Sequence, residues 1–87
     1  MVTNKKQLTL NQLGAGQTAT VVQINGGRGL LTRLDAMGIR PGKKLTKVSS
    51  MLFKGPVTLR LNGAQIAIGF GMANKIVVEV ESDKPSA

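Results

Sequence analysis

One stretch decides the fold of this chain: LLTRLDAMGIRPG, residues 30–42. Its apolar residues recur at the spacing of one helix face. These positions are Leu30, Leu31, Leu34 and Met37. Gly38 follows the last of them, where helices most often end in a residue that tolerates a left-handed backbone. Because Pro41-Gly42 then prevents the helix from resuming, the stretch predicts one short helix, and we expect it to cover a small sheet.

The clearest strand signal lies in the second half of the chain. Two segments with alternating apolar residues, Val57–Leu61 and Ala64–Ile68, flank the pair Asn62-Gly63. Asn-Gly between such segments is the strongest short-range mark of a β-hairpin with a two-residue turn. That turn sets the register. The predicted pairs are Leu61 with Ala64, Leu59 with Ile66 and Val57 with Ile68.

Further strands are predicted around the helix. They lie at residues 17–24, 43–52 and 76–80, with a short strand or single turn at 8–13 and one helical turn at 72–75. In the strand after the helix, Leu45 and Val48 have opposite parity, which a β-bulge would reconcile. About five short strands and one helix give a mainly β protein. Because so small a sheet exposes its edges unless it curls, we expect a partly open small barrel. Residues 1–7 are expected to be a flexible N-terminus, residues 8–81 the domain and residues 82–87 a polar tail.

Composition limits the possible functions. The 87 residues suit one domain, and the chain contains neither Cys nor His. This excludes disulfides and thiolate metal sites, and it removes the commonest metal ligand and general base. With only four carboxylates to act as acids or bases, an enzyme is disfavoured. The first residues lack the apolar core of a signal peptide and no apolar run could span a membrane, so we expect a cytoplasmic protein.

The chain is strongly basic. It has 12 Lys and Arg against 4 Asp and Glu, a net charge of +8, and residues 1–78 contain eleven basic side chains and one acidic. Such a field favours an anionic partner: nucleic acid, an acidic protein face or an anionic membrane leaflet. Binding of single-stranded nucleic acid normally adds aromatic stacking platforms. Only Phe53 and Phe70 could supply them, so a nucleic-acid partner is disfavoured.

The densest cationic group follows the predicted helix, at Arg40, Lys43 and Lys44. Pro41-Gly42 stiffens this corner, and a rigid loop loses little entropy when it binds. Arg40 has the fork geometry for a partner carboxylate, whereas the two lysines would mainly speed encounter. We therefore predict that Arg40, Lys43 and Lys44 form a partner-binding surface, with a solvated basic face as the competing interpretation.

Two other features have weaker specificity. The loop at residues 25–29, NGGRG, could be an anion-binding nest of backbone N–H groups or an ordinary connection, and it lacks the third glycine of a dinucleotide fingerprint. Glu79 and Glu81 alternate to one side of the last strand. They could hold a hard cation weakly or belong to a charged solvent face, and we assign no metal site and no cofactor.

Several motifs together resemble the FeoA (ferrous iron transport protein A) family over residues 8–80. They are Leu10-x-x-Leu13-x-x-Gly16, Val21-Val22-x-Ile24, Leu31-x-x-Leu34-x-x-Met37-Gly38-Ile39-x-Pro41-Gly42, Gly55-Pro56-Val57, Gly63-x-x-Ile66-Ala67-Ile68 and Ala73-x-x-Ile76-Val77-Val78. The most specific are the Met37–Gly42 block and the Ala73-x-x-Ile76 ending. The resemblance implies an SH3-like β-barrel, which is also similar to the C-terminal domain of DtxR-type metal-dependent repressors.

The same resemblance implies a function. Members of the family are non-enzymatic cytosolic accessory or regulatory proteins of bacterial ferrous iron uptake and dock on the membrane transporter FeoB, which carries a GTPase domain. For this chain it implies a location in the cytoplasm, or at the inner membrane through that partner. It also implies that there is no small-molecule substrate, and it allows weak self-association. The family's association with transition metals finds no His or Cys in this sequence. The alternative is a basic SH3-like module that binds nucleic acid or the ribosome.

Overall fold

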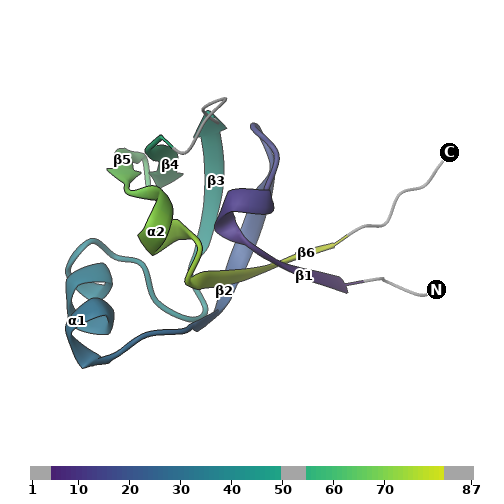
Figure 1. The fold of residues 1–87 in the computed structure, drawn as a ribbon. Helices are drawn as coiled ribbons and strands as arrows, with labels where there is room; N and C mark the ends of the chain where they lie inside the picture. The colour runs from purple at the N-terminus through teal and green to yellow at the C-terminus, as the bar shows by residue number, and fades with distance from the viewer. Residues whose placement is uncertain (1–4, 50–54, 82–87) are drawn as a thin grey trace, which may run out of the picture.

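The computed structural model describes residues 5–49 and 55–81 of the chain. Six strands, two α-helical segments and one 3-10 turn alternate along it (Figure 1). In order they are β1 (Lys5–Thr9), η1 (Leu10–Gln12), β2 (Thr18–Ile24), α1 (Arg28–Ala36), β3 (Lys44–Ser49), β4 (Val57–Leu61), β5 (Ala64–Ile68), α2 (Phe70–Ala73) and β6 (Ile76–Glu81).

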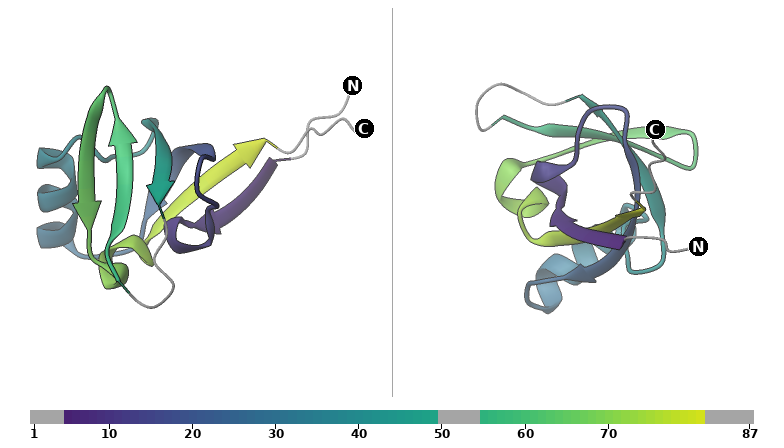
Figure 2. Two further views of the ribbon diagram at one scale, coloured as in Figure 1. Left: turned by 90° about the horizontal axis from the view of Figure 1, so that it is seen from above. Right: turned by 90° about the vertical axis from the view of Figure 1, so that its right-hand side faces the viewer.

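All six strands form one antiparallel sheet in the order β1-β6-β2-β3-β4-β5. The sheet curls around the core, as the end-on view in Figure 2 (right) shows. The strands at its two edges, β1 and β5, do not pair with each other. The turns η1 and α2 lie near the opening, where the Asn11 side-chain amide donates to the Phe70 carbonyl oxygen at 3.3 Å. The predicted mainly β architecture, a partly open small barrel, is confirmed.

The N-terminal strand differs from the sequence-based expectation. Residues 5–7 were expected to be flexible, yet β1 begins at Lys5 and pairs with β6, with Lys5 opposite Glu81 and Gln7 opposite Glu79. The barrel therefore has six strands rather than about five. β1 pairs with the edge of β6 that β2 leaves open, and this partner lies about 70 residues away in the sequence. The remaining residues of the two expected terminal segments, 1–4 and 82–87, lie outside the described part of the chain.

The hairpin has the predicted register in full. Leu61 pairs with Ala64, Leu59 with Ile66 and Val57 with Ile68. Asn62 and Gly63 both have positive φ, 52° and 82°, which is the backbone of a type I′ turn. The turn chemistry therefore fixes which side chains of β4 and β5 face the core.

Helix α1 closes one end of the barrel (Figures 1 and 2). It ends as predicted: Gly38 has φ +87°, and the backbone N–H of Ile39 donates to the Leu34 carbonyl oxygen at 2.8 Å. Leu34 and Ile39 are fully buried. Leu31 was expected to widen the buried stripe, but its exposed fraction is 40% because α1 turns only a narrow face to the core.

Strand β3 contains the predicted irregularity. A register shift lies between Lys47 and Ser49, but Val48 is only half-buried and does not join Leu45 in the core. The inward positions of β3 are Leu45 and Lys47, and both side chains are buried. A lysine thus occupies a core position, which the sequence pattern did not predict. The predicted helical turn occurs two residues earlier, at Phe70–Ala73.

Candidate functional site

The backbone of the predicted basic corner is held firmly against β2. The N–H of Gly42 donates to the Val21 carbonyl oxygen at 2.8 Å, and the N–H of Val21 donates to the Lys43 carbonyl oxygen at 2.8 Å. Within the corner, the N–H of Lys43 donates to the Arg40 carbonyl oxygen at 3.1 Å. The segment from Arg40 to Lys44 is therefore positioned by the sheet, as a rigid recognition loop requires.

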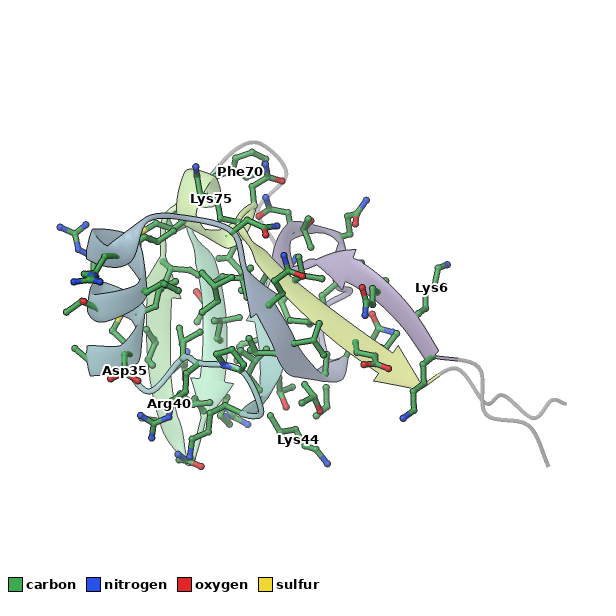
Figure 3. All side chains as sticks on the ribbon, turned by 90° about the horizontal axis from the view of Figure 1, so that it is seen from below. Lys6, Asp35, Arg40, Lys44, Phe70 and Lys75 are labelled. Carbon is green, nitrogen blue, oxygen red and sulfur yellow. The ribbon has the colours of Figure 1, made fainter. Side chains whose placement is uncertain are left out.

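One of the three cations has a partner within the chain. Arg40 Nη1 lies 2.8 Å from Asp35 Oδ1, and the two side chains are 51% and 56% exposed (Figure 3). An ion pair this exposed adds at most about 1 kcal/mol to stability. Its main effect is to orient the guanidinium, whose other N–H groups remain available to a second carboxylate.

A shallow hollow of about 320 Å³ lies beside this ion pair. It is lined by Ile24, Leu31, Thr32, Asp35, Ile39, Arg40 and Pro41. The exposed Leu31 side chain makes part of this lining apolar, while Asp35 and Arg40 supply charge. The hollow can therefore receive an apolar side chain flanked by a carboxylate.

The structure separates Lys44 from Arg40. Lys44 pairs in register with Thr20, and Thr20 also pairs with Glu79, so the three residues form one row across β3, β2 and β6. Lys44, Thr20 and Glu79 line a hollow of about 300 Å³. Figure 3 shows Lys44 on the same side of the molecule as Arg40 but farther along it. Arg40 thus borders the hollow beside α1, whereas Lys44 extends the basic surface over the sheet.

A metal site finds no support among the described residues. Within them, no group of three or more His, Cys, Asp or Glu side chains could hold an ion. Lys44 shares its hollow with Glu79, which places a cation where a metal ion would need further carboxylates. In residues 5–49 and 55–81, no helix is long and apolar enough to cross a membrane.

The glycine loop before α1 keeps its two interpretations. The N-cap of α1 is Gly27, which has no side chain that could cap the helix. The first turn carries no acidic residue, which leaves its positive end uncompensated. The N–H of Asn25 donates to the Lys75 carbonyl oxygen at 2.7 Å, so the start of the loop is tied to the start of β6. An anion-binding nest at this loop stays a prediction.

Lys47 is the residue that sequence reasoning missed. Its side chain is only 2% exposed, and its ammonium donates to the carbonyl oxygens of Leu13 at 2.7 Å, Asn11 at 3.1 Å and Leu10 at 3.4 Å. Burial lowers the pKa of Lys47 from its ordinary value. The ammonium fastens η1 to β3 through these three carbonyl groups. The Leu10 carbonyl oxygen also accepts the backbone N–H of Leu13 at 3.2 Å, so Lys47 is its second donor. The available signal was the alternation of β3, which puts Lys47 on the same face as Leu45.

Comparison with known proteins agrees with this architecture. The family model of the FeoA domain matches residues 8–80. A protein of Methanocaldococcus jannaschii named Fe(2+) transport protein A is 42% identical over 64 residues, which cover 74% of this chain and 76% of that protein. The crystal structure of an iron uptake regulatory protein (FeoA) is 32% identical, has a TM-score of 0.79, and is matched over 84% of this chain and 96% of its own.

A manganese-dependent transcriptional repressor is similar in fold alone. It is 23% identical with a TM-score of 0.77, over 90% of this chain and 44% of the repressor. The expected likeness to the barrel of metal-dependent repressors is therefore present at the level of the fold. The match to the family model covers most of the chain and spans every element from η1 to most of β6. The chain therefore belongs to the FeoA domain family.

Proposed function

We propose that this protein is a non-enzymatic, cytoplasmic accessory protein of ferrous iron uptake that docks on the cytosolic face of a FeoB-type membrane transporter. Its family membership and the names of its relatives, which refer to Fe(2+) transport and iron uptake, support the process. The scarcity of acidic side chains and the lack of His and Cys support a binding role over catalysis.

The observation that carries the docking surface is the fastening of the basic corner to β2. Because the Gly42 and Val21 amides both take part in backbone bonds across this junction, Arg40 and Lys43 project from a fixed backbone. Asp35 pre-orients Arg40 beside an apolar hollow. An acidic partner face with one apolar side chain would match this surface, and the preorganisation reduces the entropy lost on binding.

The test replaces Arg40, Lys43 and Lys44 with Ser and measures binding to the cytosolic domain of the transporter by calorimetry. We expect the Kd to rise at least tenfold, about 1.4 kcal/mol, while the circular dichroism spectrum and the melting temperature stay nearly unchanged. All three side chains are at least partly exposed, so their loss leaves the core intact.

A matched control removes the same charge elsewhere. Arg28, Arg33 and Lys75 are exposed cations outside the corner, and their replacement by Ser also lowers the net charge by three. We expect this variant to bind with nearly the parent Kd in moderate salt, because distant charges are screened over about 10 Å. Equal weakening by both triple variants would mean that general attraction, and not the corner, holds the complex.

The alternative of a nucleic-acid module is supported only by the net charge of +8. Phe70 is 37% exposed, and Phe53 lies outside the described residues. Among residues 5–49 and 55–81 there is thus one candidate stacking platform where single-strand binders use several. Titration of labelled RNA across salt concentrations separates the two functions, since tight binding that falls steeply with salt would favour nucleic acid.

A further inference from the structure

The free edge of β5 carries none of the sequence features that normally protect an edge strand. Proteins guard such edges with lysine, proline, bulges or covering elements, because an open edge pairs with other chains. The other edge strand, β1, carries Lys5 and Lys6. By contrast β5 reads AQIAI, with no charge, no proline and no register shift against β4.

The hairpin register determines which backbone groups of β5 are free. In a hairpin with a two-residue turn, the two residues that flank the turn form two backbone hydrogen bonds with each other. Moving away from the turn, every second pair of opposite residues is hydrogen-bonded in the same way. Ala64, Ile66 and Ile68 therefore bond to β4. Gln65 and Ala67 point their N–H and C=O groups away from it. Both residues are exposed, and neither makes a backbone hydrogen bond to a described residue outside the hairpin.

A second copy of this chain does not fit the edge. Antiparallel pairing of two β5 strands needs a two-fold axis perpendicular to the sheet, which puts both copies of α1 on the same face. Figures 1 and 2 show α1 on the core side of the sheet, beneath the free edge of β5 and running alongside it. The second α1 would have to occupy the space of the first. A single extended segment, which brings no helix with it, meets no such obstacle.

The side chains around the edge indicate the chemistry of that segment. On the core side, Ile66 is half-buried and Ile68 is buried, so the residues facing them gain from being apolar. On the outer side, Arg60 is exposed and lies opposite Gln65. An acidic residue placed beyond Gln65 would lie two strand spacings, about 10 Å, from the backbone of Arg60. This exceeds the screening length of about 8 Å at physiological salt, so acidic residues are favoured mainly by the net charge of +8.

We propose that β5 binds an extended segment of another protein as a seventh strand, and that apolar and acidic residues alternate in this segment. The backbone groups of Gln65 and Ala67 supply the hydrogen bonds. Ile66 favours apolar residues on one face of the segment, and the net charge of +8 favours acidic residues on the other. This is strand addition at a sheet edge, in which the main chain provides affinity and alternate side chains provide specificity. It uses a different surface from the basic corner and does not depend on the identity of the transporter.

The first experiment selects peptides from a displayed library of random dodecamers with the purified protein as target. Enriched peptides should contain at least five consecutive residues that alternate apolar with acidic, free of proline. The alternation is the informative feature, because a protein of charge +8 attracts acidic peptides of any order. Failure to enrich any peptide, or enrichment of acidic peptides without alternation, would overturn the proposal.

The second experiment tests the backbone pairing with the best selected peptide. It is made in two isomers, each N-methylated on one of the two alternating sets of amides. One isomer should lose binding at least tenfold, and the other should bind within about threefold of the parent peptide, because only one set of amides faces β5. Hydrogen exchange should slow at the Gln65 and Ala67 amides and stay unchanged at Ile66, which already bonds to β4. Equal binding by both isomers, or no new protection at Gln65 and Ala67, would overturn strand addition.

A substitution at the edge completes the test. Ala67→Pro removes an outward N–H without removing a bond to β4, and proline is tolerated at such edge positions. Binding of the peptide should fall at least tenfold, whereas Ala67→Val, which keeps the N–H, should retain it. If Ala67→Pro proves unfolded by circular dichroism, the N-methylated isomers decide the question on the unchanged protein. Undiminished binding by a folded Ala67→Pro variant would contradict the proposal.

Discussion

Replacement of Lys47 by Met tests whether the buried ammonium holds the barrel together. Methionine keeps most of the length of the side chain but donates no hydrogen bond. The substitution therefore removes the side-chain donor from the carbonyl oxygens of Leu10, Asn11 and Leu13. The Leu10 carbonyl oxygen still accepts the backbone N–H of Leu13 at 3.2 Å. Because these belong to η1 and the residue after it, the attachment of η1 to β3 should weaken first.

The magnitude follows from the three distances. The bond to Leu13, at 2.7 Å and buried, is the strong one, and a bond from a charged donor contributes about 1.5–3 kcal/mol. The bond to Leu10 is long at 3.4 Å, and the part-buried Asn11 carbonyl can be rehydrated. Met also removes the cost of burying a charge, which offsets part of the loss. We expect a net destabilisation of about 2 kcal/mol, equivalent to a fall in melting temperature of about 8–16 °C for a domain of this size.

Thermal and urea denaturation followed by circular dichroism measure this effect. Lys44→Met is the matched control, because Lys44 lies on the same strand with an exposed side chain, and it should change stability by less than about 0.5 kcal/mol. A Lys47→Met protein as stable as the parent would refute the reasoning. It would mean that the three carbonyl bonds only compensate the desolvation of the ammonium.

The pH dependence of the same pair of proteins gives an independent check. Burial lowers the pKa of Lys47 from its ordinary 10.5, so between the lowered value and 10.5 the unfolded chain binds more protons than the folded one. Stability contributed through Lys47 therefore rises with pH across this window. The difference in melting temperature between the parent and Lys47→Met should grow as the pH is raised toward 10.5.

Three further outcomes are expected. Leu34→Asp puts a charge in a fully buried position. Burying it costs several kcal/mol, against a total stability of roughly 5–15 kcal/mol, so the thermal melt should lose cooperativity. A native-like melt would show that α1 does not seal the core. Gly38→Ala should lower the stability by about 1–3 kcal/mol, because φ is +87° and the new Cβ would lie 3.0 Å from Leu61 Cδ2. Gly42→Ala also has a positive φ, +96°, but its Cβ would meet open space, so urea denaturation should show a smaller loss. Equal losses would exclude the Leu61 contact as a cause. Ferrous iron or zinc should bind no tighter than about millimolar by calorimetry, and a stoichiometric micromolar isotherm would contradict the absence of a site.

The elements that sequence alone predicted are those whose cause is local. The hairpin register follows from Asn62-Gly63, because a two-residue turn with positive φ leaves only one pairing of the flanking strands. The end of α1 follows from Gly38 and the proline after it in the same way. In each case the deciding residues lie within a few positions of the structure that they specify.

The elements that the sequence did not predict depend on distant partners. By its sequence Lys47 resembles the many surface cations of the chain. Its buried position is explained only by three carbonyl groups of residues 10–13, which lie 34 to 37 positions earlier and accept its hydrogen bonds. The strand β1 has too polar a sequence to be recognised alone, and its hydrogen-bonding partner β6 lies about 70 residues later in the chain. No periodicity within either segment carries that information.

The candidate site falls between these two cases. Proximity in the sequence grouped Arg40, Lys43 and Lys44 as one surface, but Lys44 is the first residue of β3. Its register with Thr20 places it in one row with Glu79. The pairing of Arg40 with Asp35 depends on the helix end at Gly38, which folds the chain back on itself.

Helix α1 therefore links the stability of the fold to both proposed surfaces. Leu34 seals the core, Asp35 on the same helix orients Arg40 at the basic corner, and the body of α1 lies beneath the free edge of β5. A change that displaces the helix would weaken docking at the corner and alter strand addition at the edge together, and its effect could not be assigned to either surface.

Only substitutions that leave α1 in place, such as those at Lys44 and Ala67, separate the two surfaces, because neither residue belongs to the helix or to the core. If the corner variant loses the transporter domain and keeps the selected peptide, while Ala67→Pro does the reverse, the two surfaces act independently. Loss of both ligands by either folded variant would mean that the two surfaces form a single interface around α1.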